Sequence, residues 1–229
     1  MKCKKYEAII FDLDGTLIDS MPYHLKAFQE LLSERKIKVS EKFLKGLMGM
    51  STAKILEYFK KKYKIKDNVI DLREERRYHY FRILGERNIV FSGVSETLKS
   101  LKSNNKLAIA TGSSYVTVSH SMKKSFLDLF DELVTINDVK KGKPHPEQLL
   151  VAAKKMKVKN SECLMVGDSI YDGIAARRSG MDFIGVTTGF TSEKELKKFG
   201  AIVTIKKISE LKRTLQNSQS SLRRSLNDH

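Results

Sequence analysis

The chain contains little cysteine and no long apolar run. Its 229 residues include two cysteines, Cys3 and Cys163. Cys3 lies near the N-terminus and Cys163 falls on a predicted buried strand, so we expect no disulfide between them. No apolar run approaches the roughly 20 residues that a membrane-spanning helix needs. The lysine-rich start also lacks the apolar segment of a signal peptide. These absences predict a cytoplasmic protein with no membrane partner.

Acidic residues are few relative to basic ones. The chain has 43 Lys and Arg against 27 Asp and Glu, a formal net charge of +16. Nucleic-acid binding is therefore one alternative function, because basic patches bind phosphate backbones. However, no recognised nucleic-acid motif accompanies the charge, and the lysines are spread over every predicted helix. We therefore expect no nucleic-acid partner and interpret the positive field as one that attracts anionic substrates.

The most informative feature present is an apolar run that ends in two aspartates. Residues 6–11 predict a short buried strand without alternation, which is typical of a parallel sheet covered on both faces. Asp12 and Asp14 follow at its carboxyl end, where such sheets carry their chemistry. Two carboxylates this close repel each other unless a proton or cation shares the site. A divalent cation that takes oxygen ligands, with Mg²⁺ as the first candidate, would relieve this repulsion. An ordinary Asp-Gly turn is the alternative.

Two further segments place groups that can hold a phosphate. A predicted strand at 107–110 ends in Thr111, followed by Gly112 and Ser113. The hydroxyl and the backbone N–H groups of such a loop can bind phosphoryl oxygens. Lys143 lies in a loop that Pro144 and the following residues stiffen. The two segments predict an anion site.

A third segment supplies a second acid pair. The predicted strand at 163–166 is followed by Asp168 and Asp172, four residues apart at the start of a helix. The chain thus delivers, in order, an acid pair, a hydroxyl, a lysine and a second acid pair. Each feature alone is weak, since a hydroxyl after a strand is usually a helix cap.

Together these segments resemble the four motifs of the haloacid dehalogenase superfamily of phosphohydrolases. The matching residues are D-x-D-G-T at 12–16, Thr111, Lys143 and G-D-x-x-x-D at 167–172. The resemblance extends over nearly the whole chain, from about residue 6 to about residue 215. It implies an α/β fold, a Rossmann-like doubly wound parallel sheet with an inserted all-helical cap domain. The subfamily with this cap includes phosphoglycolate phosphatases and β-phosphoglucomutases.

The resemblance also implies a role for each motif residue. Asp12 is the nucleophile that forms an aspartyl-phosphate, and Asp14 is the acid and base. Mg²⁺ binds to Asp12, to the backbone carbonyl of Asp14 and to Asp168, while Asp172 acts on a metal-bound water or on Lys143. The groups implied to bind the phosphoryl oxygens are Thr111, Gly112, Ser113 and Lys143. Because Asp14 must first donate a proton, we expect it to titrate at a higher pH than Asp12.

The texture of the sequence changes between the first two motifs. From about residue 19 to residue 88 the periodicity is helical, with helices expected at 23–33, 52–62 and 68–84. Ser20 is predicted as the N-cap of the first helix, with Pro22 just inside it. We therefore divide the chain into a core at 1–18 and 90–216 and a helical cap at 19–89.

Strands and helices alternate after the cap. This alternation predicts a parallel sheet with helices on both faces. Beyond the strands already named, strands are expected at 133–136 and 183–186, and a strand followed by a helix at 201–215. The polar, serine-rich segment 217–229 is predicted to be disordered.

Three features of the cap are candidates for substrate contact. Gly46 and Met48 lie in a segment, 46–50, that we interpret as a flexible apolar loop facing the core, with an ordinary turn between two helices as the alternative. Arg77 belongs to a basic set on the third cap helix. The alternative for that set is a solvated helix face paired with neighbouring glutamates. Arg73, Arg76 and Arg82 complete the set.

His24 bears on the choice of reaction. The segment D-S-x-x-x-H at 19–24 resembles an element of the β-phosphoglucomutase and sugar-phosphatase branch, in which the histidine positions the acid/base aspartate. A histidine that only hydrogen-bonds locally is the alternative. Gly167 and the segment 185–189 resemble general phosphatases instead. We therefore predict a monomeric or homodimeric phosphatase acting on a small phosphorylated metabolite, a sugar phosphate or phosphoglycolate, with a phosphosugar mutase as the alternative.

Overall fold

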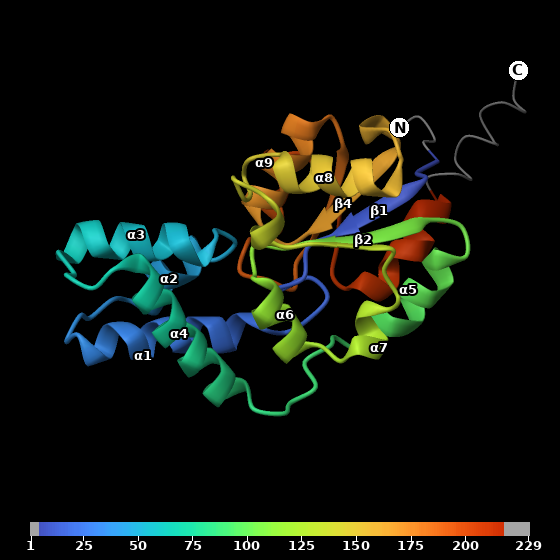
Figure 1. The fold of residues 1–229 in the computed structure, drawn as a ribbon. Coiled ribbons are helices and arrows are strands. Elements are labelled where there is room, and N and C mark those ends of the chain that lie inside the picture. Colours follow the sequence, from blue (N-terminus) through green and yellow to red (C-terminus); the bar gives the residue numbers. More distant parts are fainter. Residues whose placement is uncertain (1–4, 218–229) are drawn as a thin grey trace, which may run out of the picture.

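Six parallel strands form a single sheet in the computed structural model, which describes residues 5–217 (Figure 1). Their spatial order is β3-β2-β1-β4-β5-β6. The central strand β1 pairs with β2 on one side and with β4 on the other. The strands are β1 (Ala8–Phe11), β2 (Lys106–Ala110), β3 (Glu132–Val134), β4 (Cys163–Gly167), β5 (Asp182–Val186) and β6 (Ala201–Ile205).

Both faces of the sheet are buried. Ile9 and Phe11 point into one apolar cluster, and Ala8 and Ile10 point into another. Helix α5 (Val94–Lys102) covers the first face, while α8 (Glu147–Met156), α9 (Ile170–Ser179) and α10 (Glu193–Lys198) cover the second (Figure 1). Every residue of β1 is therefore apolar because neither face meets water. The doubly wound parallel sheet expected from the sequence is confirmed.

Four helices follow β1 and lie together beside the sheet (Figure 1). They are α1 (Met21–Glu34), α2 (Glu41–Leu47), α3 (Thr52–Tyr63) and α4 (Val69–Leu84). They share an apolar cluster of their own, with Phe28 and Phe59 among its largest side chains. The segments entering and leaving this group run side by side, since Ile18 and Val90 form an antiparallel bridge. We retain the division into a core at 1–18 and 90–216 and a cap at 19–89 as a proposal.

Some element boundaries differ from the sequence-based expectations. The segment 46–50 is not wholly a loop, because Gly46 is inside α2, a helix that the periodicity did not predict. Ser40 caps this helix by accepting a hydrogen bond from the Phe43 N–H. The capped helix α10 and the short α7 (Lys124–Leu127) were not predicted either. Strand β3 ends at Val134 rather than at residue 136, because Thr135 caps a 3₁₀ turn.

Other expectations concern residues at the two ends. Cys3 and residues 218–229 of the predicted disordered segment lie outside the described residues. Residues 211–217 are helical, as expected for the end of the core. Within residues 5–217, none of the helices is long and apolar enough to cross a membrane.

Candidate active site

Three neighbouring strands bring the sequence motifs to one edge of the sheet. Phe11, the last residue of β1, lies opposite Ile109 of β2 and Val166 of β4. Asp12 continues this register, and its backbone N–H donates to the Val166 carbonyl at 2.9 Å. Because parallel strands end at the same edge, the residues that follow them meet there. The resemblance to a known family implied that these residues share one site.

Lys143 lies between two carboxylates of different motifs. Its Nζ is 2.7 Å from Oδ1 of Asp12 and 2.6 Å from Oδ1 of Asp172. Burial alone would lower the pKa of Lys143, but the charges and hydrogen bonds of the two aspartates raise it well above its usual value. The ammonium is therefore charged at neutral pH. Gln148 holds the loop in place by accepting the Lys143 N–H at 3.3 Å. The expected contact between Asp172 and Lys143 is present.

A group of three buried carboxylates can hold a metal ion. Ligand oxygens of Asp12, Asp168 and Asp172 lie within 4.8 Å of one another. Burial raises the pKa of Asp168 well above its usual value, and the charges of Asp12 and Asp172 add to the rise. One lysine does not balance three carboxylates, so the donor set fits a hard divalent cation. The Asp14 side chain is not part of this group. Asp172 is part of it, although it was expected to act on a metal-bound water or on Lys143 and not as a direct ligand.

Glycines let the surrounding backbone approach Asp168 closely. Gly15 has a φ of 81°, and a Cβ there would lie 2.6 Å from Oδ2 of Asp168. A Cβ on Gly189 would lie 1.8 Å from the same oxygen. The Thr16 hydroxyl donates to the other oxygen, Oδ1, at 2.8 Å. The Asp168 carboxylate is therefore held between two backbone turns that only glycine allows.

Asp14 turns away from the acidic group and toward hydroxyls. Its Oδ1 accepts hydrogen bonds from Ser20 at 2.6 Å and from His24 Nε2 at 2.9 Å. Its Oδ2 accepts from Ser113 at 2.7 Å and from Thr111 at 3.2 Å. Ser20 was expected to cap the first helix, but its hydroxyl binds Asp14 and makes no capping hydrogen bond. Thr111 and Ser113, expected to bind phosphoryl oxygens, contact Asp14 in this structure.

The surroundings of the two catalytic candidates shift their pKa values in the order opposite to the one expected. Burial raises the pKa of Asp12 to about 7, with Lys143 opposing this and nearby carboxylates adding to it. Burial would also raise the pKa of Asp14, but interaction with His24 and the hydroxyls of Ser20 and Ser113 outweighs burial. The pKa of Asp14 is therefore well below its usual range. Its environment stabilises the ionised form because every contact named here is a donor.

His24 connects Asp14 to a buried arginine. The guanidinium of Arg76 donates to Nδ1 of His24. The arginine side chain has no hydrogen-bond acceptor, so Nδ1 of His24 must be the unprotonated nitrogen. Nε2 therefore carries the proton and donates the hydrogen bond to Asp14. Burial, followed by the charge of Arg76, lowers the pKa of His24, which keeps the imidazole neutral. The Tyr80 ring stacks on His24 with 4.2 Å between ring centroids. His24 thus contacts the acid/base candidate, as the resemblance implied.

The arginines of the basic set have different environments. Arg76 is buried, whereas Arg77 pairs with Glu74 and Arg82 pairs with Glu30. The interpretation as a solvated helix face is thus wrong for Arg76 and correct in part for the others.

A cavity of about 50 Å³ opens in front of Asp12 and Lys143. The cap contributes Met48, His24 and Arg76 to its wall. Gly46 does not line this cavity, and instead borders a neighbouring groove that Asp168 and Met48 also line. Of the two apolar-loop candidates, only Met48 therefore reaches the catalytic cavity.

Sequence reasoning did not single out several residues of the site. Ser20 falls within the 19–24 element but was interpreted as a helix N-cap. Thr16 falls within the first motif but was given no role of its own. Gln148 carried none, because a glutamine on a helix is an ordinary residue, and Gly189 was noted only as part of the segment 185–189 that resembles general phosphatases.

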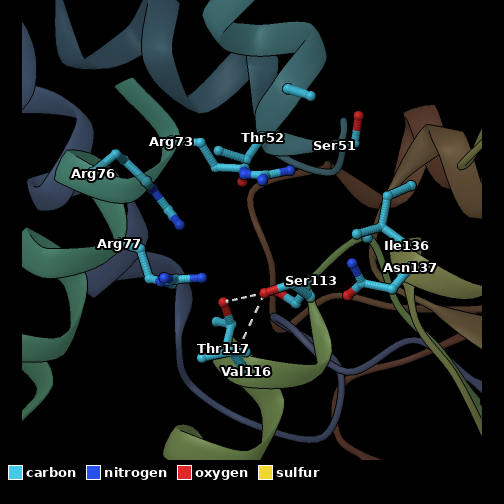
Figure 2. Close-up of a pocket in the computed structure, with 13 residues that line it drawn as sticks. Ser51, Thr52, Arg73, Arg76, Arg77, Ser113, Val116, Thr117, Ile136 and Asn137 are labelled. Atoms are coloured by element: carbon cyan, nitrogen blue, oxygen red, sulfur yellow. Dashed lines mark hydrogen bonds between the residues drawn. The ribbon is translucent and has the colours of Figure 1, made fainter. Parts of the chain in front are cut away.

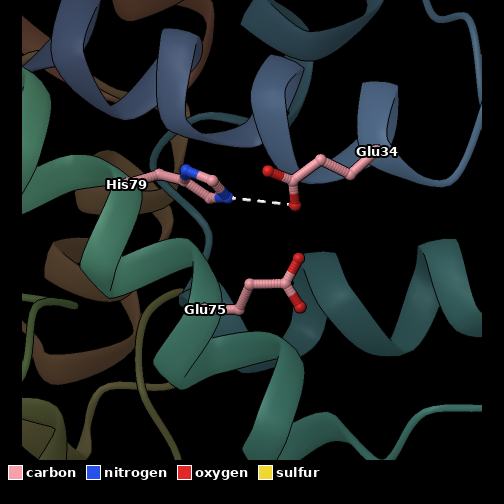
Figure 3. A group of neighbouring side chains, drawn as sticks. All are labelled: Glu34, Glu75 and His79. Atoms are coloured by element: carbon pink, nitrogen blue, oxygen red, sulfur yellow. Dashed lines mark hydrogen bonds and ion pairs between the residues drawn. The ribbon is translucent and has the colours of Figure 1, made fainter.

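A second group of metal-ligating side chains lies on the cap, where Glu34 of α1 faces Glu75 and His79 of α4 (Figure 3). Nε2 of His79 is 3.3 Å from Oε2 of Glu34. Glu75 is already bound by Arg35, whose Nη1 and Nη2 donate to it at 2.7 and 2.6 Å. Because the guanidinium supplies the positive charge, these contacts serve to join α1 to α4.

Comparisons with known proteins agree with this geometry. Residues 9–186 match the model of the haloacid dehalogenase-like hydrolase family. A phosphoglycolate phosphatase from Colwellia psychrerythraea is 29% identical, over 87% of this chain and 92% of that protein. Pyrophosphatase PpaX from Bacillus cereus is also 29% identical, over 95% of this chain and 100% of that protein. A crystal structure of β-phosphoglucomutase from Clostridium difficile superposes with a TM-score of 0.80 and 28% identity, over 95% of this chain and 98% of that one. The chain therefore belongs to the haloacid dehalogenase-like hydrolases, and it is a phosphatase.

Proposed function

We propose that this phosphatase is Mg²⁺-dependent and hydrolyses a small phosphorylated metabolite through an aspartyl-phosphate on Asp12. The observation that carries the proposal is the position of Asp12, which lies 2.7 Å from the buried cation of Lys143 and beside the carboxylates of Asp168 and Asp172. This arrangement places a nucleophile and compensating positive charge at one point of a small cavity.

The first half-reaction uses the two motif aspartates on opposite sides of the phosphate. An Asp12 oxygen attacks phosphorus, the bond between phosphorus and the ester oxygen breaks, and Asp14 gives a proton to the departing oxygen. In the second half-reaction Asp14 takes a proton from water, which attacks phosphorus and releases Asp12 and phosphate. Bound Mg²⁺ would supply positive charge beside Asp12 and Asp168 that keeps Asp12 ionised and neutralises the phosphoryl oxygens.

Asp14 must gain a proton before it can act. In the free enzyme its hydrogen-bond donors favour the carboxylate. A phosphate dianion bound next to it would raise its pKa, because like charges disfavour each other's ionised form. Thr111 and Ser113 can rotate their hydroxyls from Asp14 toward the phosphoryl oxygens when substrate binds. They would then bind Asp14 in the free enzyme and the phosphoryl group in the complex.

A phosphosugar mutase is the second candidate. The contact between His24 and Asp14 favours it, because a positioned acid/base aspartate can accept a proton from a sugar hydroxyl instead of from water. The names of the relatives include a mutase beside the phosphatases, and in a mutase a sugar hydroxyl rather than water accepts the phosphoryl group.

A substrate panel tests the proposal. Phosphate release is measured with Mg²⁺ and with EDTA on phosphoglycolate, hexose and pentose phosphates, glycerol phosphates, nucleotides and pyrophosphate. Conversion of β-glucose 1-phosphate to glucose 6-phosphate is followed in parallel. We expect metal-dependent release from one small class of compounds. Sugar-phosphate isomerisation without phosphate release would support the mutase, and activity that survives in Asp12→Asn would overturn the covalent mechanism.

A further inference from the structure

Gln148 is a fully buried amide that contacts two loops of the active site. It is the second residue of α8 and is 0% exposed. Its Nε2 donates to the backbone carbonyl of Thr111 at 2.5 Å, and its Oε1 accepts the backbone N–H of Lys143 at 3.3 Å. Because a carbonyl only accepts and an N–H only donates, these two partners fix the orientation of the amide. One side chain therefore bridges the end of β2 and the loop that carries the lysine.

The two bridged segments carry the groups inferred to hold the phosphoryl oxygens. Thr111 begins the loop after β2, and its hydroxyl oxygen accepts the backbone N–H of Ser113 at 3.0 Å. Ser113 faces the cap from this loop and lines a cleft together with Thr52 of α3 (Figure 2). On the other segment, the Lys143 ammonium lies 2.7 Å from Oδ1 of Asp12. The bridge thus joins the hydroxyl side of the inferred phosphoryl site to its ammonium side.

Packing alone does not explain a glutamine at this position. Leu149, the next residue of α8, is buried in the apolar cluster on this face of the sheet. An apolar side chain at position 148 would therefore suit the core, but it would leave the Thr111 carbonyl and the Lys143 N–H without their partner. Thr111 lies one residue beyond β2, where the hydrogen-bond ladder has ended, and it is 0% exposed. Buried backbone groups are almost always paired, so the amide takes the place of a neighbouring strand.

Glu147, the residue before Gln148, holds the same loop at a different point. Its two carboxylate oxygens accept the backbone N–H groups of Lys140 and Lys141, each at 3.0 Å. These contacts anchor the first part of the loop to α8. Gln148 instead holds the backbone at Lys143 itself and ties it to the end of β2. The chain therefore separates two tasks, anchoring of the loop and its spacing from β2, on successive residues.

We infer that Gln148 is a positioning residue of the phosphatase reaction. Its amide keeps the hydroxyls that follow β2 and the Lys143 ammonium at the spacing that a phosphoryl group in transfer needs. This inference rests on the proposed function, because it takes these groups as the ones that bind the phosphoryl oxygens. Charge in the transition state is spread over three equatorial oxygens, and donors held in place stabilise it without reorganising. Loosening either loop therefore weakens binding of the transition state more than binding of the ground state.

Calorimetry with two inorganic probes tests the inference. Orthophosphate has the tetrahedral shape of the product, whereas orthovanadate can adopt the five-coordinate shape through which phosphorus passes. The dissociation constants of both anions are measured in Mg²⁺, and kcat and KM are measured on the best substrate of the panel. A residue that only stabilises the fold would not change the ratio of the two dissociation constants.

Three variants are compared with the wild type. Gln148→Met removes both hydrogen bonds at nearly the same side-chain volume. Glu147→Met is the first control, because it releases the first part of the loop but leaves the bridge to Thr111. Leu149→Ala is the second control, because it opens a cavity on the same helix but removes no hydrogen bond of either loop. Urea denaturation then shows how much stability each variant has lost.

In Gln148→Met we expect kcat to fall about tenfold, less than the roughly hundredfold loss that a misplacement of about 1 Å can cause. The dissociation constant of vanadate should rise about tenfold, and that of phosphate by about threefold at most. Both controls should keep the wild-type values of kcat and of the two constants, although Leu149→Ala unfolds at a lower urea concentration.

An unchanged vanadate constant in Gln148→Met would overturn the inference. An equal rise of that constant in Glu147→Met or in Leu149→Ala would do the same, because it would assign the effect to loop anchoring or to lost stability. A wild-type protein that releases no phosphate from any compound of the panel would instead overturn the proposed function. The two failures are distinguishable, because calorimetry needs no turnover.

Discussion

Arg76 donates a hydrogen bond to Nδ1 of His24, and this contact keeps the proton of the imidazole on Nε2, the nitrogen that faces Asp14. With the proton held on Nε2, the ring donates to Asp14 and orients its carboxylate in the cavity. The relationship joins the cap to the core, because Arg76 and His24 lie on α4 and α1 while Asp14 follows β1. Movement of the cap would therefore alter the hydrogen bonding of the acid/base candidate.

Replacing His24 should impair catalysis more than folding. In His24→Ala, Asp14 loses a donor at 2.9 Å and its fixed orientation. We expect kcat to fall on the order of a hundredfold, at the low end of what general acid–base catalysis contributes. His120→Ala is the matched control, since that histidine is exposed and stacks on Phe81. Wild-type turnover in His24→Ala, measured at saturating substrate, would contradict a positioning role.

Replacing Lys143 should lower stability as well as activity. In Lys143→Met the buried carboxylates of Asp12 and Asp172 lose their shared cation. We expect the free energy of unfolding in EDTA at pH 7 to fall by about 3 kcal/mol, because a broken buried pair leaves uncompensated charge. The loss should shrink as the pH is lowered, since protonated carboxyls no longer need the cation.

Urea denaturation measures this change. Lys155→Met is the control, because Lys155 lies 3.7 Å from Glu132 with its side chain 42% exposed, and such surface pairs contribute less than about 1 kcal/mol. Equal losses in the two variants would show that Lys143 is not needed to balance the acidic group.

Asp168 should be required for the response to metal. In Asp168→Asn the acidic group loses one of three buried carboxylates, while the acceptor for Thr16 is kept. We expect a higher Tm than that of the wild type in EDTA, because repulsion is relieved, and no rise in Tm when Mg²⁺ is added. The wild type should gain stability from Mg²⁺, since a ligand that binds only the folded state stabilises it.

Thermal unfolding with and without Mg²⁺ provides the comparison. Glu193→Gln, which alters an exposed glutamate of α10, should respond to Mg²⁺ as the wild type does. If Asp168→Asn were stabilised by Mg²⁺ to the same degree, the metal site would have to lie elsewhere.

The sequence predicted the parts of the site that depend on strand ends. A buried strand of a parallel sheet is apolar throughout, so the polar residue that ends it is visible in the sequence. Asp12, Thr111 and Asp168 were found in this way, and the sheet brings them together because their strands are neighbours.

The contacts between cap and core could not be predicted in the same way. A charged residue on a helix is usually exposed, and nothing in the sequence distinguishes buried Arg76 from Arg82 on the same helix. The local sequence favours Ser20 as the N-cap of α1, but in the folded chain its hydroxyl donates to Asp14 instead. Helix α2 has 7 residues, which is too short for a periodic pattern to show.

Gly189 and Gly46 should respond in opposite ways to an added methyl group. A Cβ on Gly189 would lie 1.8 Å from Oδ2 of Asp168, so Gly189→Ala must displace that carboxylate or its own loop. We expect kcat to fall on the order of a hundredfold, as for a misplacement of about 1 Å.

Gly46 lies inside α2 and has no atom within 4 Å of the position that a Cβ would take. Gly46→Ala should therefore raise the free energy of unfolding by roughly 0.5–1 kcal/mol, because alanine loses less backbone freedom on folding. Urea denaturation and kcat are measured on both variants. Loss of stability in Gly46→Ala would contradict the helical placement of Gly46 and favour the flexible loop expected at residues 46–50. Full activity in Gly189→Ala would show that catalysis tolerates a displaced Asp168 carboxylate.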